Sequence, residues 1–478
     1  QVYKYKNIII VMNINNDILN EIRQAAGENN VLQNLEEKIP YKNDASYMPG
    51  RIPELVIIPE NSDQISRVLK LCTKYKIDVT VRSGGTSLTG SSVTNYNGII
   101  INTMKMDKIL ELNIASRYVV CQPGVRLDNL NEYLNKYGFF YPPDPASSKA
   151  STVGGTISTN AGGLRAVRYG ATKEWVLGTE FVTATGEIIR TGEYTLKRSA
   201  GYDLTALIIG SEGTLGVLTE AILKIEPLPE KYGRILSFYN DIYDVGSALS
   251  AVKNAGITPL IAEFMDLKTI NSIRDKLNIK IPDYTQFMLM VDIDSTEASL
   301  KGKIENVEKI IKNYTKDVLT IMDQKTMDEI YKARKGAYSA LLNQREKKNE
   351  IVIIGDVIVP ASELPATLKE IKNAVDKMKI NVSLFGHIGD GNIHANIFAD
   401  NTKTGLEKVE KLQMEIAMAA IRHKGCVSAE HGIGTEKNKL LYEEYKERNS
   451  LYSLELMKRI KAVFDPENIM NRGKIFYD

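Results

Sequence analysis

Apolar residues recur at helical spacing through residues 61–75, which predicts a helix there. We expect Ser62 or Asp63 as its N-cap, because both side chains can accept a backbone N–H. Residues 77–81 and 99–102 are expected as strands, and 176–190 as a strand hairpin. The helical spacing depends on Ile65, Val68, Leu69 and Cys72.

After Pro227–Pro229 the glycines become sparse and longer amphipathic segments begin, which indicates a domain boundary. Helical and strand patterns then alternate, so we expect an α+β second domain packed over the first. The expected helices are 244–253, 295–314, 327–344, 363–378, 405–423 and 451–464, and the expected strands are 286–294, 318–322, 351–359 and 381–385.

Length and composition agree with a folded protein of several domains. A chain of 478 residues exceeds one ordinary core, and its 43% hydrophobic and 25% charged residues are typical of globular proteins. We expect a first domain at 13–229, a second at 230–425, and a segment at 426–478 that returns to the first.

The charge balance and the cysteine pattern restrict the expected partners and the expected cellular location. The 61 basic and 59 acidic side chains form no basic stripe, so nucleic acid is not an expected partner. Cys72, Cys121 and Cys426 lie far apart without a CxxC pair, which favours a reducing, cytoplasmic location. The early apolar run Ile8–Met12 is too short to span a membrane, and Met12 is a candidate start of the natural chain.

Three segments are rich in glycine and hydroxyl groups: 82–92, 142–170 and 210–220. The first has Walker-A spacing between Gly85 and Gly90, but Ser91 replaces the lysine, and it has no GxGxxG pattern. Such segments can be plain turns, or they can let a long, flat ligand approach the backbone.

All four histidines lie after residue 386, and two flank an Asp-Gly pair. A type I′ turn at Asp390-Gly391 would place His387 directly opposite His394, with Cβ atoms about 5 Å apart. That separation suits two ligands of one metal ion, although two histidines can also simply pair across a hairpin.

The segment 428–434 adds Glu430 and His431 between small residues. Two imidazoles and a carboxylate form a three-ligand set that suits zinc and also fits non-haem iron. The spare histidine would then be a base, unless this segment is an ordinary solvated loop.

The order of these motifs, with His-x-Gly-Asp-Gly-Asn-x-His and Ser-Ala-Glu-His-Gly, resembles the FAD-dependent D-2-hydroxyacid dehydrogenases of the vanillyl-alcohol oxidase superfamily over about residues 52–474. The resemblance implies an α+β fold, in which an FAD-binding domain of two α+β subdomains carries an α+β cap. The cofactor-binding residues that it implies are Arg82, Ser83, Gly84, Gly85, Thr86, Ser87, Gly90, Pro143, Asp144, Ser151, Thr152, Gly154, Gly155, Ser158, Asn160, Gly162, Gly213, Gly216 and Val217.

The same resemblance implies roles around the substrate. His387, His394 and Glu430 would bind a divalent metal, with zinc the first choice, and His431 would be the base. Arg334 would bind the substrate carboxylate and Asn396 would lie close to the substrate.

The expected reaction is oxidation of a D-2-hydroxy acid to the 2-oxo acid, with hydride transfer to the flavin N5. Tyr338 and Ile354 depart from the hydroxyglutarate enzymes, which favours D-lactate or glycolate over D-2-hydroxyglutarate. Two alternatives are a metal-dependent hydrolase with a structural nucleotide and a flavin-carrying electron-transfer subunit without hydroxyacid activity.

The positions of the histidines and cysteines bear on how FAD would be attached and where its electrons would go. Because the first half contains no histidine, a histidyl link to FAD is impossible, and non-covalent FAD is expected. Cys121 is the remaining conceivable attachment point, although a buried structural role is the alternative. The three cysteines show no iron–sulfur pattern, so electrons would pass to an iron–sulfur subunit, an electron-transfer flavoprotein or a quinone. Membrane association would then occur only through such a partner.

Overall fold

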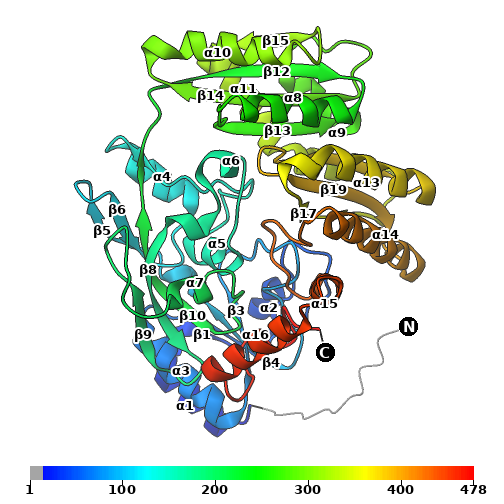
Figure 1. The fold of residues 1–478 in the computed structure, drawn as a ribbon. Helices are drawn as coiled ribbons and strands as arrows, with labels where there is room; N and C mark the ends of the chain where they lie inside the picture. Colours follow the sequence, from blue (N-terminus) through cyan, green and yellow to red (C-terminus); the bar gives the residue numbers. More distant parts are fainter. Residues whose placement is uncertain (1–13, 478) are drawn as a thin grey trace.

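The computed structural model describes residues 14–477. The N-terminal part of this range contains a four-stranded sheet of order β1-β2-β4-β3. Strands β2, β4 and β3 run parallel, and β1 is antiparallel to β2. Two helices pack on this sheet through a buried apolar core (Figure 1). The elements are α1 (Asn16–Ala26), β1 (Val31–Leu32), α2 (Leu35–Lys38), β2 (Leu55–Ile57), α3 (Ser62–Tyr75), β3 (Asp78–Arg82) and β4 (Gly98–Asn102).

The helix predicted at 61–75 is α3, but its N-cap is Asn61 instead of Ser62 or Asp63. The Asn61 side chain accepts a hydrogen bond from the Gln64 N–H at 3.0 Å. Asn61 has extended backbone angles, so Ser62 and Asp63 already belong to the helix, and asparagine caps as well as either of them. The predicted apolar stripe is buried against the sheet.

A second, antiparallel sheet has the order β5-β6-β10-β8-β9. The predicted hairpin is confirmed as β8 and β9, and Gly186 in its turn has φ +81°. Strands β7 and β11 pair separately as a two-stranded sheet. The elements of this part of the chain are β5 (Ile109–Asn113), β6 (Tyr118–Cys121), α4 (Leu127–Asn135), β7 (Phe139–Phe140), α5 (Val153–Thr159), α6 (Ala166–Tyr169), β8 (Val176–Thr183), β9 (Ile188–Gly192), α7 (Leu204–Ile208), β10 (Gly216–Lys224) and β11 (Glu226–Pro227).

The cap is built on an eight-stranded sheet of order β15-β12-β14-β13-β18-β19-β16, with β17 paired to β19. Strands β12 and β13 and helix α9 were not predicted. The strands are β12 (Lys231–Tyr239), β13 (Ile261–Asp266), β14 (Phe287–Ser295), β15 (Val318–Ile321), β16 (Glu350–Ile354), β17 (Val357–Ile358), β18 (Val382–Gly386) and β19 (Asn392–Asp400).

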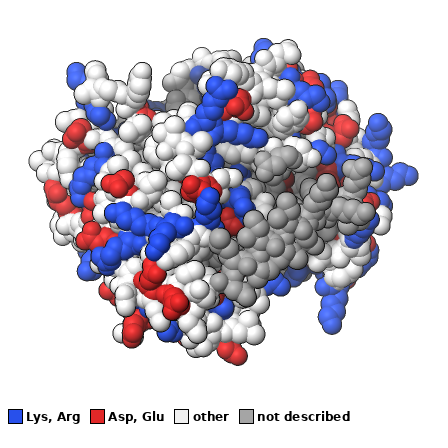
Figure 2. All heavy atoms as spheres, turned by 90° about the horizontal axis from the view of Figure 1, so that it is seen from below, with Lys and Arg blue, Asp and Glu red and all other residues white. Residues whose placement is uncertain are grey.

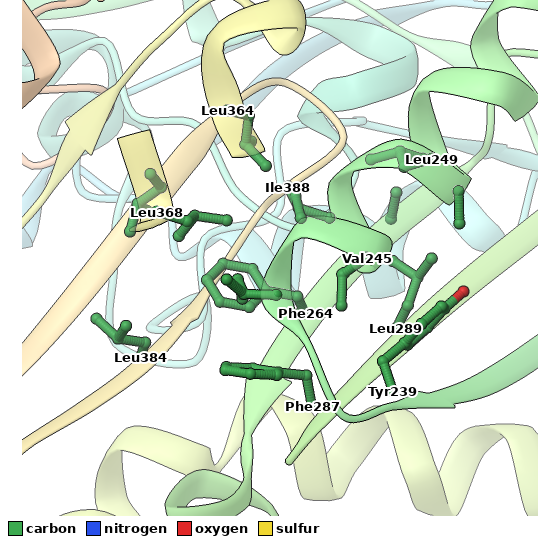
Figure 3. Packing of buried hydrophobic residues seen from close by; sticks show 14 of the residues in the cluster. Tyr239, Val245, Leu249, Phe264, Phe287, Leu289, Leu364, Leu368, Leu384 and Ile388 are labelled. Carbon is green, nitrogen blue, oxygen red and sulfur yellow. The ribbon is translucent and has the colours of Figure 1, made fainter. Parts of the chain in front are cut away.

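Helices cover both faces of the cap sheet. Alternate residues of β13 and β14 enter two separate cores, as expected when successive side chains point to opposite faces. Figure 3 shows the first core, where Phe264 and Leu289 of the sheet meet Val245 and Leu368 of the helices. The helices of this core are α8 (Ile242–Asn254), α10 (Glu297–Ile311), α13 (Leu364–Met378) and α14 (Lys403–Arg422), and those of the other are α9 (Leu267–Leu277), α11 (Gln324–Lys335) and α12 (Ala337–Leu342).

Two predicted cap elements are each split in two. The helix expected at 327–344 breaks at Gly336 into α11 and α12, because Gly336 leaves helical geometry at ψ 3°. The strand expected at 351–359 breaks after β16, where the Gly355 N–H donates to Ala395 O at 2.7 Å. This second break frees Asp356 from the sheet pairing.

The C-terminal segment returns to the first domain (Figure 1). After α15 (Asn438–Glu447) and α16 (Leu451–Phe464), Met470 forms a bridge beside Val79 of β3. The Asn471 side chain accepts from the Val81 N–H at 2.9 Å. Chain segments nearly four hundred residues apart are therefore fastened together at the edge of the first sheet.

The surface carries both signs of charge, and acidic and basic side chains intermingle on the face in Figure 2. Within residues 14–477, no helix is both long and apolar enough to cross a membrane. The apolar run Ile8–Met12 lies outside the described residues.

Candidate functional site

A cavity of about 350 Å³ is lined jointly by the first domain and the cap. Residues from all three glycine-rich segments line it, together with Arg334 and the motif residues His387, His394, Glu430 and His431. The glycine-rich segments and the histidine cluster therefore face one space. The predicted cofactor residues that line it are Arg82, Ser83, Gly84, Gly85, Thr86, Ser87, Ser151, Thr152, Gly154, Gly155, Ser158, Gly213 and Gly216.

The first two glycine-rich segments pack directly on each other. A Cβ at Gly84 would lie 2.4 Å from the Ala150 carbonyl oxygen, so no larger residue fits there. The Thr152 hydroxyl donates to the Ser83 hydroxyl at 2.8 Å across the same contact. Glycine thus keeps two backbone segments close together along the wall of the cavity.

Six predicted cofactor residues do not line this cavity. Gly90 accepts a hydrogen bond from Lys474 at its carbonyl oxygen, and Asn160 accepts one from the Lys173 N–H. A Cβ at Gly162 would lie 3.0 Å from a carboxylate oxygen of Glu430. These contacts support neighbouring segments. The six residues are Gly90, Pro143, Asp144, Asn160, Gly162 and Val217.

Asp144 joins the first domain to cap helix α11. Its carboxylate accepts from Lys335 Nζ at 2.7 Å and from the Tyr331 hydroxyl, and Arg165 Nε lies 3.9 Å away. Burial alone would raise the pKa of Asp144, but Arg165 and Lys335 lower it below its ordinary value. Lys335, which lines the cavity, also donates to Ser148 at 2.8 Å and is thereby occupied.

The hairpin that carries His387 and His394 does not have the predicted register. Phe385 pairs with His394, so residues 387–391 form a five-residue loop between β18 and β19. Gly391 has φ +96°, but Asp390 lacks the positive φ that a type I′ turn requires. A Cβ at Gly391 would lie 1.9 Å from the Val359 carbonyl oxygen, which shows how closely the loop packs on the residue after β17.

The side chains of the cluster nevertheless converge. Oε1 of Glu430 lies 3.3 Å from His387 Nε2, 3.3 Å from His394 Nε2 and 3.5 Å from His431 Nε2. Metal–ligand bonds of about 2.0–2.1 Å in a tetrahedral site separate the ligand atoms by about 3.3–3.4 Å. The donor set His387, His394 and Glu430 therefore fits a zinc-sized cation, and its ligand atoms all lie within 4.8 Å of one another.

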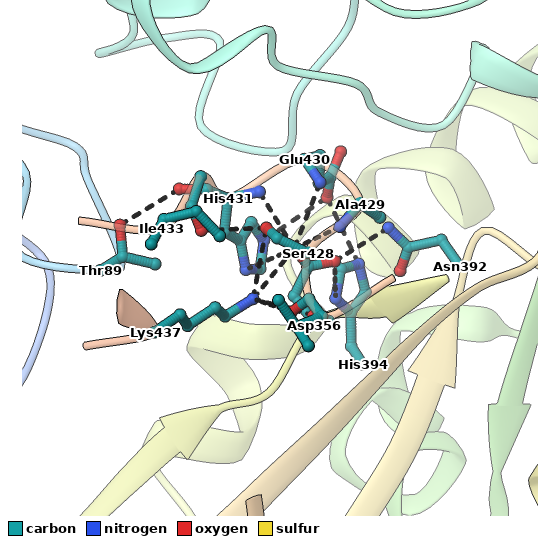
Figure 4. Close-up of polar contacts among 12 residues, drawn as sticks. Thr89, Asp356, Asn392, His394, Ser428, Ala429, Glu430, His431, Ile433 and Lys437 are labelled. Carbon is teal, nitrogen blue, oxygen red and sulfur yellow. Dashed lines mark hydrogen bonds and ion pairs between the residues drawn. The ribbon is translucent and has the colours of Figure 1, made fainter. Parts of the chain in front are cut away.

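Asp356, His394 and His431 form a second group of the same size. However, Oδ2 of Asp356 already accepts the N–H groups of Ala429, Glu430 and His431 at 3.0–3.2 Å and the Ser428 hydroxyl at 2.9 Å (Figure 4). Asp356 therefore holds the loop that carries Glu430 and His431, and sequence reasoning missed it. Its position beside the glycine that interrupts an apolar strand was the available signal.

The third glycine-rich segment supports the same loop from the opposite side. Glu212 accepts the Ile433 N–H at 2.7 Å and the Gly434 N–H at 2.8 Å. Burial raises the pKa of Glu212, and these two backbone donors oppose that rise. Thr89 of the first segment donates to the His431 carbonyl oxygen at 3.3 Å (Figure 4). The histidine loop is thus positioned by both domains.

The Nε2 atom of His431 lies almost as close to Glu430 Oε1 as those of the two predicted ligands, at 3.5 Å compared with 3.3 Å. Its ring stacks on that of His394, with centroids 5.0 Å apart and an interplanar angle of 11°. Among the described residues its Nδ1 has no hydrogen-bond partner, and Asp356 Oδ2 lies 3.9 Å away. Geometry alone does not separate base from ligand, so this assignment stays a prediction.

Arg334 is buried at the cavity wall, contrary to what a lone arginine on a charged helix suggests. Its Nη2 lies 2.5 Å from Oε2 of Glu263, and its guanidinium lies 4.4 Å from the Phe385 ring centre. The other carboxylate oxygen of Glu263 accepts from His387 Nδ1 at 2.6 Å. Sequence reasoning missed Glu263, although an acidic residue within the apolar strand Ile261–Asp266 was a signal.

Asn396 is buried on β19, two residues from His394, and does not line the cavity. Its amide donates to the Ser383 carbonyl oxygen at 3.2 Å, while its Oδ1 has no partner within the described part of the chain. Its expected place near the substrate stays a prediction.

Cys121, the conceivable attachment point for FAD, is fully buried and does not line the cavity. Burial raises the pKa of its thiol to about 12.

The cavity and the two-part scaffold place the chain among FAD-binding oxidoreductases. Residues 53–192 match the family model "FAD binding domain", and residues 228–475 match "FAD linked oxidases, C-terminal domain". The chain belongs to the FAD-linked oxidase family, and the resemblance to its D-2-hydroxyacid dehydrogenase branch is confirmed.

Several curated relatives match along nearly the whole chain. The glycolate oxidase subunit GlcD of Bacillus subtilis is 36% identical over 467 residues, covering 97% of both chains. The mitochondrial D-lactate dehydrogenase (cytochrome) of Arabidopsis thaliana is 30% identical, covering 92% of this chain and 78% of its own. The D-2-hydroxyglutarate dehydrogenase of Stutzerimonas stutzeri is 29% identical, covering 96% and 98%.

Solved structures confirm the predicted fold class. p-Cresol methylhydroxylase with substrate bound has a TM-score of 0.79 at 17% identity and covers 97% of both chains. The 4-ethylphenol oxidase of Gulosibacter chungangensis has a TM-score of 0.78 at 17% identity and covers 96% of both. The α+β architecture of an FAD-binding domain with a cap is therefore shared.

Proposed function

We propose that this protein oxidises a small D-2-hydroxy acid, such as D-lactate or glycolate, to the 2-oxo acid. The observation that carries this proposal is the single cavity lined by glycine-rich backbone on one side and by Arg334, three histidines and Glu430 on the other. Three relatives are named as a glycolate oxidase subunit, a D-lactate dehydrogenase and a D-2-hydroxyglutarate dehydrogenase, and these names support the same substrate class.

The glycine-rich wall fits FAD because its backbone segments leave no room for side chains. A Cβ at Gly84 or at Gly154 would lie within 2.5 Å of neighbouring atoms. Bound FAD would supply the hydride acceptor for the substrate Cα. Because no cysteine or histidine among residues 14–477 lines the cavity on the first-domain side, we propose that FAD is held non-covalently.

His387, His394 and Glu430 would hold a divalent cation, with zinc the first choice. Such an ion supplies Lewis acidity that favours an ionised hydroxyl group. His431 lines the cavity and its Nε2 lies 3.5 Å from Glu430 Oε1, so this nitrogen would accept the proton of the substrate hydroxyl. Arg334, which lines the same cavity, would orient the substrate carboxylate through its guanidinium group.

The cap wall favours a substrate with one carboxylate. Tyr338, Ile354 and Phe385 line the cavity near Arg334, and the Tyr338 hydroxyl donates to a backbone carbonyl at 3.2 Å. Lys335 is occupied by Asp144 and Ser148, so a second carboxylate would lack a free cation on this wall. D-2-Hydroxyglutarate is therefore the less favoured alternative.

Electrons from reduced flavin would leave to a separate acceptor. The three cysteines of the sequence are too few for a four-thiolate iron–sulfur cluster. The acceptor would be an iron–sulfur subunit, an electron-transfer flavoprotein or a quinone.

Dye-linked kinetics with a substrate panel tests this proposal. We expect kcat/KM to be highest for D-lactate or glycolate, lower for D-2-hydroxyglutarate and negligible for L-lactate. A preference for D-2-hydroxyglutarate would show that the single-carboxylate interpretation of the cap wall is wrong. A yellow protein inactive with the whole panel would favour an electron-transfer subunit.

A further inference from the structure

Glu263 is a fully buried carboxylate in the middle of the cap sheet. It lies on β13 between Ala262 and Phe264, which both enter the first apolar core, so its own side chain lies on the opposite face with Ile261 and Met265. A buried anion is costly unless charged or hydrogen-bonding partners surround it. Each of its two oxygens has one such partner, and both partners line the cavity.

The first partner is His387. Because a carboxylate only accepts hydrogen bonds, Nδ1 must carry the proton in the 2.6 Å contact with Oε1. Nε2 is then the nitrogen available for a metal, and it lies 3.3 Å from Glu430. A carboxylate behind a ligating histidine fixes both its tautomer and its ring orientation.

The second partner is Arg334. Nη2 of Arg334 lies 2.5 Å from Oε2 of Glu263, and Phe385 packs against the guanidinium plane. Only 3% of the Arg334 side chain is exposed, so without Glu263 this cation would be buried with no counter-charge on that side. Glu263 therefore determines where the guanidinium lies at the cavity wall.

We propose that Glu263 is a positioning residue that couples the metal-binding histidine to the substrate-binding arginine. It holds His387 in the tautomer that a metal needs and Arg334 in the place that a substrate carboxylate needs. The role of Glu263 at Arg334 rests on the proposed function, because it concerns the substrate carboxylate. Its role at His387 depends only on metal binding by His387, His394 and Glu430.

The test is Glu263→Gln, which keeps the size of the side chain and removes its charge. We expect zinc affinity, measured by chelator competition without substrate, to fall by about 10- to 100-fold, as for other outer-shell partners. We also expect KM for D-lactate to rise, while the FAD content stays at the wild-type level because the flavin segments lie in the other domain.

The same sheet offers a matched control. Asp292 and Arg234 form another buried pair, with contacts of 2.7 Å, and Asp292 pairs with Ile261 on the strand that carries Glu263. Neither residue lines the cavity. Asp292→Asn should lower the melting temperature and leave zinc affinity and KM unchanged. Equal losses of zinc in the two variants would reduce Glu263 to a structural role and overturn the proposal.

Glu263→Asp covers the case in which the glutamine variant does not fold. Aspartate keeps the charge but is one methylene shorter, so it cannot reach both partners; zinc affinity and KM should both be impaired, less than in the glutamine variant. Wild-type values of both quantities would contradict the proposal. If neither D-lactate nor glycolate proves to be a substrate, the proposed function fails, whereas the zinc measurement still decides the role of Glu263 at His387.

Discussion

Three imidazole nitrogens surround one carboxylate oxygen of Glu430, but only two of them are expected to bind the metal. Replacing His387 or His394 by alanine leaves two protein ligands. Zinc affinity should then fall by more than the roughly 100-fold limit seen for outer-shell partners. FAD should stay bound in both variants, and elemental analysis beside the flavin spectrum measures the two outcomes.

His431→Ala should behave in the opposite way. Metal and FAD both remain, and flavin reduction by substrate slows by about 10²- to 10⁴-fold, as for loss of a general base. His423 provides the control, because it binds Glu363 and Glu370 at 3.1 Å away from the cavity. Zinc lost only in the His431 variant would mean that ligand and base are interchanged.

FAD is expected to be bound without a covalent link to any side chain. Acid precipitation should release FAD into the supernatant, since the first half of the sequence has no histidine and Cys121 is buried away from the cavity lining. The absorbance of pellet and supernatant measures this directly. Colour that remains in the pellet, and disappears from it in a Cys121→Ser variant, would instead establish a cysteinyl link.

At the scale of elements, the loop between β18 and β19 determines how the histidines meet. Gly391 has φ +96° and no space for a Cβ, whereas Gly256 has φ +78° with nothing within 4 Å of its Cβ position. Both alanine variants should lose about 1–2 kcal/mol for the left-handed backbone. Gly391→Ala should lose clearly more stability and also zinc, whereas Gly256→Ala should retain full zinc binding. Thermal melting and zinc content compare them, and equal behaviour would show that the packing of this loop is unimportant.

Local patterns predicted most elements of the fold but not their interruptions. Helix α3 was visible because Ile65, Val68 and Leu69 repeat at helical spacing, and its burial confirms the pattern. The hairpin register was wrong because Gly391 packs against Val359, a contact that depends on the distant strand β17. The break at Gly355 likewise involves a distant partner, the Ala395 carbonyl oxygen on β19.

The candidate site was predictable to the extent that its residues occur in compact motifs. His387, His394, Glu430 and His431 come together as their motifs indicated. Glu263, Asp356 and Glu212 were missed because each is a single acidic residue whose partners are distant in the sequence. Even the nearest of them, Asn392 beside Asp356, is 36 positions away. Only the folded chain brings such groups together.

In the molecule as a whole, side chains of both domains hold the site in place. Glu212 of the first domain fixes the loop that carries His431, and its own carbonyl oxygen accepts from Asn471 of the returning segment at 2.5 Å. Asp144 of the first domain also binds Lys335 of the cap at 2.7 Å. The glycine-rich wall of the cavity and the cluster of His387, His394, Glu430 and His431 are thus fixed relative to each other by contacts from both domains.

A bound flavin and a 2-hydroxy acid are expected to meet in this one cavity. An anaerobic absorbance spectrum of the purified protein, recorded before and after addition of D-lactate or glycolate, tests it most directly. We predict a yellow protein whose flavin absorbance bleaches with at least one of these acids and does not bleach with L-lactate. A colourless protein, or a yellow one that no 2-hydroxy acid reduces, would contradict the account.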